Sequence, residues 1–216
     1  MKNPSNDKKP AISCGGNGPL IVKGLTSLKN AAGEALESKP TLALCRCGGS
    51  ANKPFCDGAH AKNGFSGENN ADRSPDKLEA YPGKEITILD NRFQCAHVGT
   101  CTEQLKQVFR YGEAPWIEPG QEDTRLIQAA IDQCPSGALS YQLSNLPAGE
   151  GPGEAAGEAS ITVSKNGPYY VRGGIDLETT AWAEGATRQR YALCRCGASK
   201  NKPFCDGSHY EARFKD

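Results

Sequence analysis

Short apolar stretches separated by Gly, Pro and Asn run through much of the chain, and they predict strands rather than long helices. Residues 20–24 (LIVKG) follow an Asn-Gly-Pro turn and carry the apolar and β-branched side chains typical of a strand. Residues 169–173 (YYVRG) follow the same turn, and two further short strands are expected at 41–44 and 190–193. The pattern therefore predicts two similar, small, β-rich units.

Between these units the pattern changes to a mixture of strand and helix. Strands are expected at 85–89 and 137–141, and two helices are expected between them because apolar residues recur at intervals of three and four. The second helix should deliver Cys134 at its end, where Pro135 stops it. The apolar positions are Leu105, Val108 and Phe109 in the first helix and Leu126, Ile127, Ala130 and Ile131 in the second.

The two outer units are copies of one sequence. With an offset of 149 residues, positions 12–65 align on 161–214 without a gap, and 24 of the 54 pairs are identical. Cys14 falls opposite Val163, an apolar strand position, so we interpret this thiol as a small hydrophobe rather than a ligand.

The repeat and two polar segments divide the chain into parts. Ser66 to Tyr81 is polar with little to bury, and Ser144 to Ser160 is rich in Gly, Pro, Glu and Ala, so both are expected to be linkers. The expected organisation is a polar tail (1–11), a first copy (12–65), a linker (66–81), a central module (82–143), a linker (144–160) and a second copy (161–216).

The composition suits small modules that are stabilised by bound metal. Only 37% of the residues are hydrophobic, while Gly and Pro supply 25 and 14 residues, so each core must be small. Modules of about 60 residues usually need disulfides, metals or partners for stability. Nine of the ten cysteines form three groups of three, and every histidine lies inside one of them, which a disulfide framework would not predict.

Each copy carries one sixteen-residue stretch that gathers three thiols and one imidazole. It begins with Cys-Arg-Cys-Gly. It ends with Lys-Pro-Phe-Cys-Asp-Gly, which is followed by one variable residue and a histidine. Such a set could form a structural zinc site, but the Cys-x-Cys spacing is shorter than zinc sites usually have. The stretch resembles the CDGSH iron–sulfur (mitoNEET-like) family, whose pattern both copies satisfy. A visible absorption spectrum separates the two alternatives, because zinc is colourless.

The resemblance implies a [2Fe-2S] cluster in each copy, with two cysteines on one iron and Cys plus His on the other. The implied ligands are Cys45, Cys47, Cys56 and His60 in the first copy and Cys194, Cys196, Cys205 and His209 in the second. Asp57 is expected to cap a helix that places Cys56 and His60 on one face. Ser208, which replaces Ala59, is expected to donate a hydrogen bond near the second cluster.

The central module resembles one half of a bacterial ferredoxin, in the divergent single-cluster form. Cys95 and Cys101 match the outer positions of Cys-x2-Cys-x2-Cys, and Cys134 with Pro135 matches the distant ligand. Val98 occupies the middle position and cannot bind iron. Three thiolates favour a [3Fe-4S] cluster, whereas a [4Fe-4S] cluster needs a fourth ligand, either solvent or His97. The alternative is a set of buried structural cysteines without a cluster.

These inferences predict a small, loop-rich α+β protein. Two β-rich CDGSH units should pack as an intramolecular pseudo-dimer around a pseudo-twofold axis, exchanging or sharing strands, with the ferredoxin-like module to one side. We expect a monomer built in this way, and a homodimer of it remains an alternative.

Charge and hydropathy narrow the functional classes. The formal net charge is zero, so no nucleic-acid partner is expected. Residues 1–10 are polar and no apolar run approaches the roughly 18 residues needed to span a bilayer, so we expect a cytoplasmic protein without a membrane anchor. No catalytic constellation remains once the cysteines and histidines are assigned to metal, so an enzyme is not expected.

Three clusters in one chain favour electron transfer with a redox protein. The alternatives are donation of a cluster to an apo-iron–sulfur acceptor, suggested by the labile histidine ligand, and a redox or pH sensor.

Overall fold

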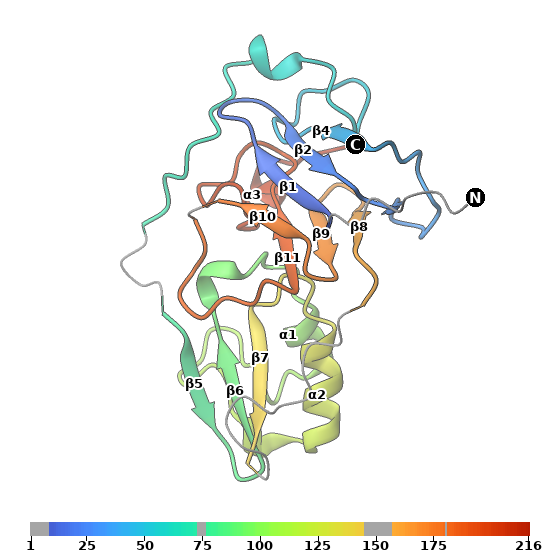
Figure 1. Cartoon of the computed structure of the whole chain (residues 1–216). Helices are drawn as coiled ribbons and strands as arrows, with labels where there is room; N and C mark the ends of the chain where they lie inside the picture. The colour runs from blue at the N-terminus through green and yellow to red at the C-terminus, as the bar shows by residue number, and fades with distance from the viewer. Residues whose placement is uncertain (1–8, 73–76, 145–156, 180) are drawn as a thin grey trace, which may run out of the picture.

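The computed structural model describes residues 9–72, 77–144, 157–179 and 181–216, which form three β-sheets and a few short helices (Figure 1). Two four-stranded sheets lie at one end, with the C-terminus, and a three-stranded sheet with helix α2 lies at the other end. This is the small, loop-rich α+β architecture that the sequence predicts.

Each copy of the repeat contributes four strands, and the 149-residue offset relates them residue for residue. The apolar–polar alternation sets their orientation: in β2, Leu20 and Val22 are buried while Lys23 is exposed. The strands are β1 (Ala11–Cys14), β2 (Leu20–Lys23), β3 (Ser27–Lys29) and β4 (Thr41–Leu44) in the first copy, and β8 (Ser160–Val163), β9 (Tyr169–Arg172), β10 (Asp176–Glu178) and β11 (Arg190–Leu193) in the second.

The two copies exchange one strand each. β10 of the second copy pairs in parallel with β1, giving a sheet in the order β10-β1-β2-β4. β3 of the first copy pairs in parallel with β8, giving the order β11-β9-β8-β3. Leu28 and Leu177, one from each exchanged strand, are buried in a single core with apolar residues of both copies. The expected pseudo-dimer is therefore confirmed, and neither copy completes its sheet alone.

The central module has a sheet in the order β5-β6-β7, covered by helix α2. Asp123 begins this helix by accepting a hydrogen bond from the backbone N–H of Arg125, and Ile127, Ala130 and Ile131 are buried against the sheet. The elements are β5 (Glu79–Pro82), β6 (Ile86–Asp90), η2 (Arg92–Gln94), α1 (Thr100–Gln104), η3 (Pro119–Gln121), α2 (Thr124–Asp132) and β7 (Leu139–Leu143).

The prediction of a helix through Leu105, Val108 and Phe109 is wrong. α1 ends at Gln104, and the backbone then turns. Val108 accepts a hydrogen bond from the N–H of Glu118, and Phe109 bridges Ile117, so this stretch pairs with a later one instead. All three side chains are buried, because a turn can bury the same spacing of apolar residues that a helix does.

The segment expected as a first linker is partly structured. β5 begins at Glu79, inside residues 66–81. Further upstream, the backbone N–H of Asn70 donates to the carbonyl of Lys200, and the side chain of Asn69 donates to the carbonyl of Lys202. The polar residues of this segment therefore bind the second copy of the repeat. Most of the second expected linker lies outside the described residues.

The central module packs on the second copy through buried polar contacts. Arg190, at the start of β11, donates to the carbonyls of Asp132 and Leu139, at distances of 2.8 and 3.3 Å. In the opposite direction, Asn201 of the second ligand loop donates to the carbonyl of Phe93. These bonds satisfy buried groups on both sides and hold the module in one orientation.

Candidate metal centres

A short hairpin positions the ligands in each copy. Strand β4 ends at Leu44, which forms an isolated bridge with Phe55 across the loop. The backbone N–H of Cys45 donates to the carbonyl of Pro54, and that of Cys56 donates to the carbonyl of Ala43. Two ligands eleven residues apart in sequence are thus brought side by side. The second copy repeats the arrangement with Cys194 and Cys205.

A serine holds the turn of each hairpin. The hydroxyl of Ser50 donates to the carbonyl of Phe55 and accepts from the N–H of Asn52. Ser199 makes the equivalent contacts in the second copy, and both serines are buried. The serine of the sequence pattern therefore shapes the ligand loop rather than binding metal.

The four predicted ligands of each copy form two close pairs. In the first copy, the Sγ atoms of Cys45 and Cys47 lie 3.7 Å apart, and the Sγ of Cys56 lies 3.4 Å from Nδ1 of His60. In the second copy the corresponding distances are 3.8 and 3.4 Å. Two thiolates bound at about 2.3 Å to one tetrahedral metal would lie ~3.8 Å apart, so each cysteine pair fits one metal ion.

The pairs fit a two-metal cluster better than a single zinc ion. Within the described ranges, no three Cys, His, Asp or Glu side chains are grouped as they would be around one metal ion. A structural zinc site requires four ligands on one ion. Two pairs, one of two thiols and one of thiol and imidazole, instead match the two irons of a binuclear cluster.

Asp57 is not the helix cap that the sequence predicts. The helical turn η1 (Ala59–Ala61) begins after Gly58, whose φ of 87° suits glycine. The Asp57 carboxylate instead accepts hydrogen bonds from the N–H groups of Ala51 and Ala59, and these bonds lower its pKa. It therefore ties the hairpin turn to the segment that carries His60.

Asp206 makes the same pair of backbone contacts in the second copy. Its carboxylate accepts from the N–H groups of Lys200 and Ser208, before helix α3 (Ser208–Glu211). The hydroxyl of Ser208 also donates to Asp206, at 2.6 Å. The hydroxyl therefore donates a hydrogen bond next to the second site, as the sequence predicts, and its acceptor is the Asp206 carboxylate.

A buried arginine lies between the two cysteines of each Cys-x-Cys pair. Arg46 donates to the carbonyls of Gly16 and Gly18, while Arg195 donates to those of Ser164 and Gly167. Each arginine thereby fixes the Asn-Gly-Pro turn of its own copy against its ligand loop. This explains why the turn and the metal motif recur together in the sequence.

The two ligand loops contact each other across the pseudo-twofold axis. A Cβ atom on Gly48 would collide with the carbonyl oxygen of Cys196, and one on Gly197 would lie 2.8 Å from that of Cys47. Both glycines have φ values, 75° and 83°, that L residues rarely adopt. The two sites therefore adjoin through the residues that follow their second cysteine.

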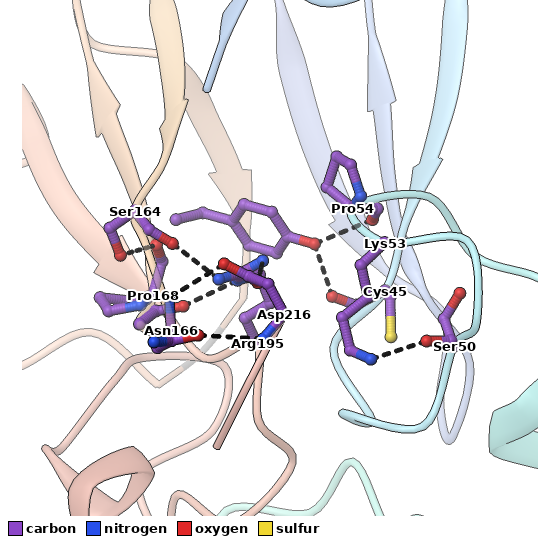
Figure 2. A network of polar contacts seen from close by, with 11 residues as sticks. Cys45, Ser50, Lys53, Pro54, Ser164, Asn166, Pro168, Arg195 and Asp216 are labelled. Carbon is purple, nitrogen blue, oxygen red and sulfur yellow. Dashed lines mark hydrogen bonds and ion pairs between the residues drawn. The ribbon is translucent and has the colours of Figure 1, made fainter. Parts of the chain in front are cut away.

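The loops are also linked by a buried tyrosine from the second copy. The hydroxyl of Tyr169 donates to the carbonyl of Cys45, at 2.7 Å, and lies 3.0 Å from the carbonyl of Pro54 (Figure 2). Its counterpart at the 149-residue offset is Leu20, which has no hydroxyl. The first ligand loop thus receives a hydrogen bond that the second does not.

The three central cysteines line one cavity, together with Val98, Trp116 and Ser136. Cys101 comes from α1, Cys134 follows α2, and Cys95 follows the 3-10 turn η2. Burial, with a smaller contribution from the nearby Cys134, raises the pKa of the Cys95 thiol to about 11 against the lowering effect of Arg92. Thiols buried together in this way are expected to ionise only when a metal replaces their protons.

Arg92 is the cation of the central site. It lies 3.6 Å from the Sγ of Cys95, stacks on the ring of Trp116 and forms an ion pair of 3.0 Å with the buried Asp90. Such a group would compensate part of the negative charge of an anionic cluster.

The loop with His97 and Val98 contacts the second copy directly. Ala96 is buried in one apolar cluster with Ala192 and Cys205, and Val98 packs against that cluster. His97 has a φ of 52°, its N–H donates to Cys95, and its side chain borders Gly207. Val98, at the position where a ferredoxin has its middle cysteine, thus also serves the contact with the neighbouring copy.

The central module makes the two repeated sites unequal. In the second copy Cys205 and His209 are buried, with 3% and 6% of their surfaces exposed. Their counterparts Cys56 and His60 are both partly exposed. Sequence comparison of the two copies could not show this difference, because it comes from a contact outside the repeat.

Cys14 lies on β1 and packs against the core of the repeats, as the alignment with Val163 predicts. Burial raises the pKa of its thiol, which suits a neutral side chain. Within the part of the chain that the structure describes, no helix combines the length and apolar character required to cross a bilayer.

Comparison with known families agrees with this arrangement. The family described as "Iron-binding zinc finger CDGSH type" matches residues 17–61 and 166–210. The family described as "Divergent 4Fe-4S mono-cluster" matches residues 81–144. The second description names a 4Fe-4S cluster and not the [3Fe-4S] cluster that the three cysteines favoured.

Two curated relatives are themselves uncharacterised. The protein YjdI of Escherichia coli strain K12 is 37% identical over 62 residues, which are 29% of this chain and 82% of that protein. YjdI of Escherichia coli O157:H7 matches with the same values. A comparison with solved structures gave no match.

The unequal burial of the two repeated sites predicts unequal sensitivity to acid. Burial lowers the pKa of His209, so its imidazole stays neutral, and able to hold metal, to a lower pH. His60 is partly exposed, so solvent reaches this ligand more readily. On acidification below about pH 6.5, the ordinary histidine pKa, we expect visible absorbance to fall in steps. The first-copy cluster should be lost first, then the second-copy cluster, and the central cluster, which three cysteines would hold, last.

Matched variants assign the steps. His60→Cys should abolish the fastest phase and leave the next one, whereas His209→Cys should leave the fastest phase unchanged. A fastest phase that survives His60→Cys would contradict this order.

Proposed function

Because the chain belongs to the CDGSH iron–sulfur family and also carries a divergent 4Fe-4S mono-cluster domain, we propose that it transfers electrons through three clusters. Each copy of the repeat would hold a [2Fe-2S] cluster and the central module a third one. The proposal includes no substrate chemistry of its own, since the cysteine and histidine groups that could serve catalysis are assigned as metal ligands. Its partners would be one-electron redox proteins.

The observation that carries this proposal is the order of the three sites in space. Ala96, the residue after Cys95, is buried in one apolar cluster with Cys205 of the second copy, and the loop after Cys196 of that copy contacts Cys47 of the first. The second-copy site therefore lies between the other two. Adjoining sites in series are the arrangement that stepwise electron transfer requires, whereas storage or structural sites need no such contact.

The residues of the chain fix the positions of the centres and set the charge of their ligands. When bound, each cluster accepts and releases one electron. The hairpin hydrogen bonds fix both ligand pairs, and one buried arginine in each copy holds the Asn-Gly-Pro turn against the ligand loop. One imidazole in place of a thiolate removes a negative charge, which raises the reduction potential, as in Rieske centres.

For the central site we propose a [4Fe-4S] cluster held by Cys95, Cys101 and Cys134, in agreement with the description of the matching family. His97 is the nearest candidate for the fourth ligand, because it borders the cavity with the cysteines. Solvent is the alternative ligand, and it would leave one iron easily lost on oxidation.

Substitutions at the two neighbouring positions test this assignment. If His97 is a ligand, His97→Ala should convert the cluster to a [3Fe-4S] form on brief exposure to air, detected by EPR of the oxidised protein. The parent and the double variant His97→Ala/Val98→Cys should both keep four irons, since the new thiol would supply the ligand. A parent that already loses iron at the same rate as His97→Ala would identify solvent as the ligand.

A second function, donation of a cluster to another protein, is favoured by the partial exposure of Cys56 and His60. The two functions are separated by mixing the reduced protein with an oxidised ferredoxin, and the oxidised protein with an apo-ferredoxin. We expect fast reduction of the first partner and cluster retention, by absorbance and iron content, with the second. Cluster transfer faster than electron transfer would overturn the proposal.

A further inference from the structure

The two copies differ in the charge that pairs with the arginine of their Cys-x-Cys motif. Arg195 forms an ion pair with Asp216, whose backbone N–H and carboxylate are also hydrogen-bonded to Asn166 (Figure 2). At the equivalent position the first copy has Gly67, whose N–H bonds to Asn17 in the same way. The backbone arrangement is thus conserved between the copies, and only the carboxylate is absent from the first.

Arg46 therefore keeps its full positive charge beside the first site. Its partners among the described residues are the carbonyls of Gly16 and Gly18 and the ring of Phe65, all of them neutral. It is 3% exposed, so solvent screens its charge weakly. A Cβ on Gly67 would lie 2.7 Å from the guanidinium and would also collide with the carbonyl of Gly16, which leaves no room for a side chain there.

Two further differences act on the second site in the same direction. Cys205 and His209 are buried beneath the central module, and burial disfavours the form of a cluster that carries more negative charge. The central site also adjoins Cys205, because Ala96, the residue after Cys95, is buried with Cys205 in one apolar cluster. A second anionic cluster there would oppose the addition of an electron to the second-copy site.

Two pairs of charged residues near the ligands recur in both copies, whereas Lys200 replaces Ala51 and Glu211 replaces Lys62. Lys53 and Lys202 each donate to the carbonyl of the loop serine, and Asp57 and Asp206 make the same backbone contacts. The charges of these two pairs therefore have the same sign at both sites. Adding one electron makes a cluster more negative, so an uncompensated cation raises its reduction potential and a nearby carboxylate lowers it.

We propose that Arg46, freed from the carboxylate that neutralises Arg195, makes the first-copy site the terminal electron acceptor of the chain. This inference rests on the proposed function and adds a direction to it. One electron passes from the reduced central cluster to the oxidised second-copy cluster and then to the oxidised first-copy cluster. A one-electron protein acceptor would receive it there, where Cys56 and His60 are partly exposed.

The test is an EPR-monitored redox titration of the intact protein and of Asp216→Asn. His60→Cys marks the first-copy signal by changing its g values, and His209→Cys marks the second. We expect the first-copy cluster to be reduced at the higher potential. Asp216→Asn should raise the second-copy potential and so narrow the difference between the two [2Fe-2S] potentials. We expect the equilibrium constant for electron transfer between these clusters to change roughly tenfold, which corresponds to about 59 mV for one electron.

Two further variants serve as controls. Asp176→Asn removes the same charge from an exposed position of β10 and should leave the gap unchanged. Arg46→Gln should lower the first-copy potential alone. The Asp216 side chain is 40% exposed, so its amide should not disturb folding.

The possible results of the titration distinguish the proposed direction of electron transfer from the proposed function itself. A second-copy cluster of higher potential, or a gap that Asp216→Asn leaves unchanged, would overturn the direction while leaving the relay intact. Absence of two distinct [2Fe-2S] signals in the parent would overturn the proposed function itself.

Discussion

The close contact between the two Cys-x-Cys loops is the constraint on which the rest of the structure depends. Gly48 and Gly197 meet the opposite loop at distances that exclude a Cβ, so the two copies must approach through these residues. Exchange of β3 and β10 holds them in this register, since each copy supplies a strand that the other lacks. The strand exchange that completes the fold of each unit therefore also sets how closely the two sites approach.

The central module breaks the symmetry that the repeat sets up. It docks on the second copy through Arg190 and Asn201 and covers Cys205 with Ala96 and Val98. Only one of two nearly identical sites is enclosed in this way. The other site stays partly open, beside Arg46, which has no carboxylate partner among the described residues. Two sequences that share their ligands thus acquire different surroundings.

The grouping of the motif cysteines and histidines, the repeat and the strand-exchanged pairing could be predicted from the sequence, because the metal motif recurs with its Asn-Gly-Pro turn at one fixed offset. The helix expected at Leu105 could not, since the same apolar spacing also fits a buried turn. The cap assigned to Asp57 failed because Gly58 takes that position with a positive φ. The pairing of Arg195 with Asp216 joins residues 21 positions apart and follows only from the folded structure.

The order of the three sites is the central claim, and magnetic coupling between reduced clusters tests it most directly. EPR of the fully reduced protein should show the second-copy signal split or broadened by both neighbours. The first-copy and central clusters should couple to it more strongly than to each other. Three signals without interaction, or a colourless protein containing zinc, would contradict the account.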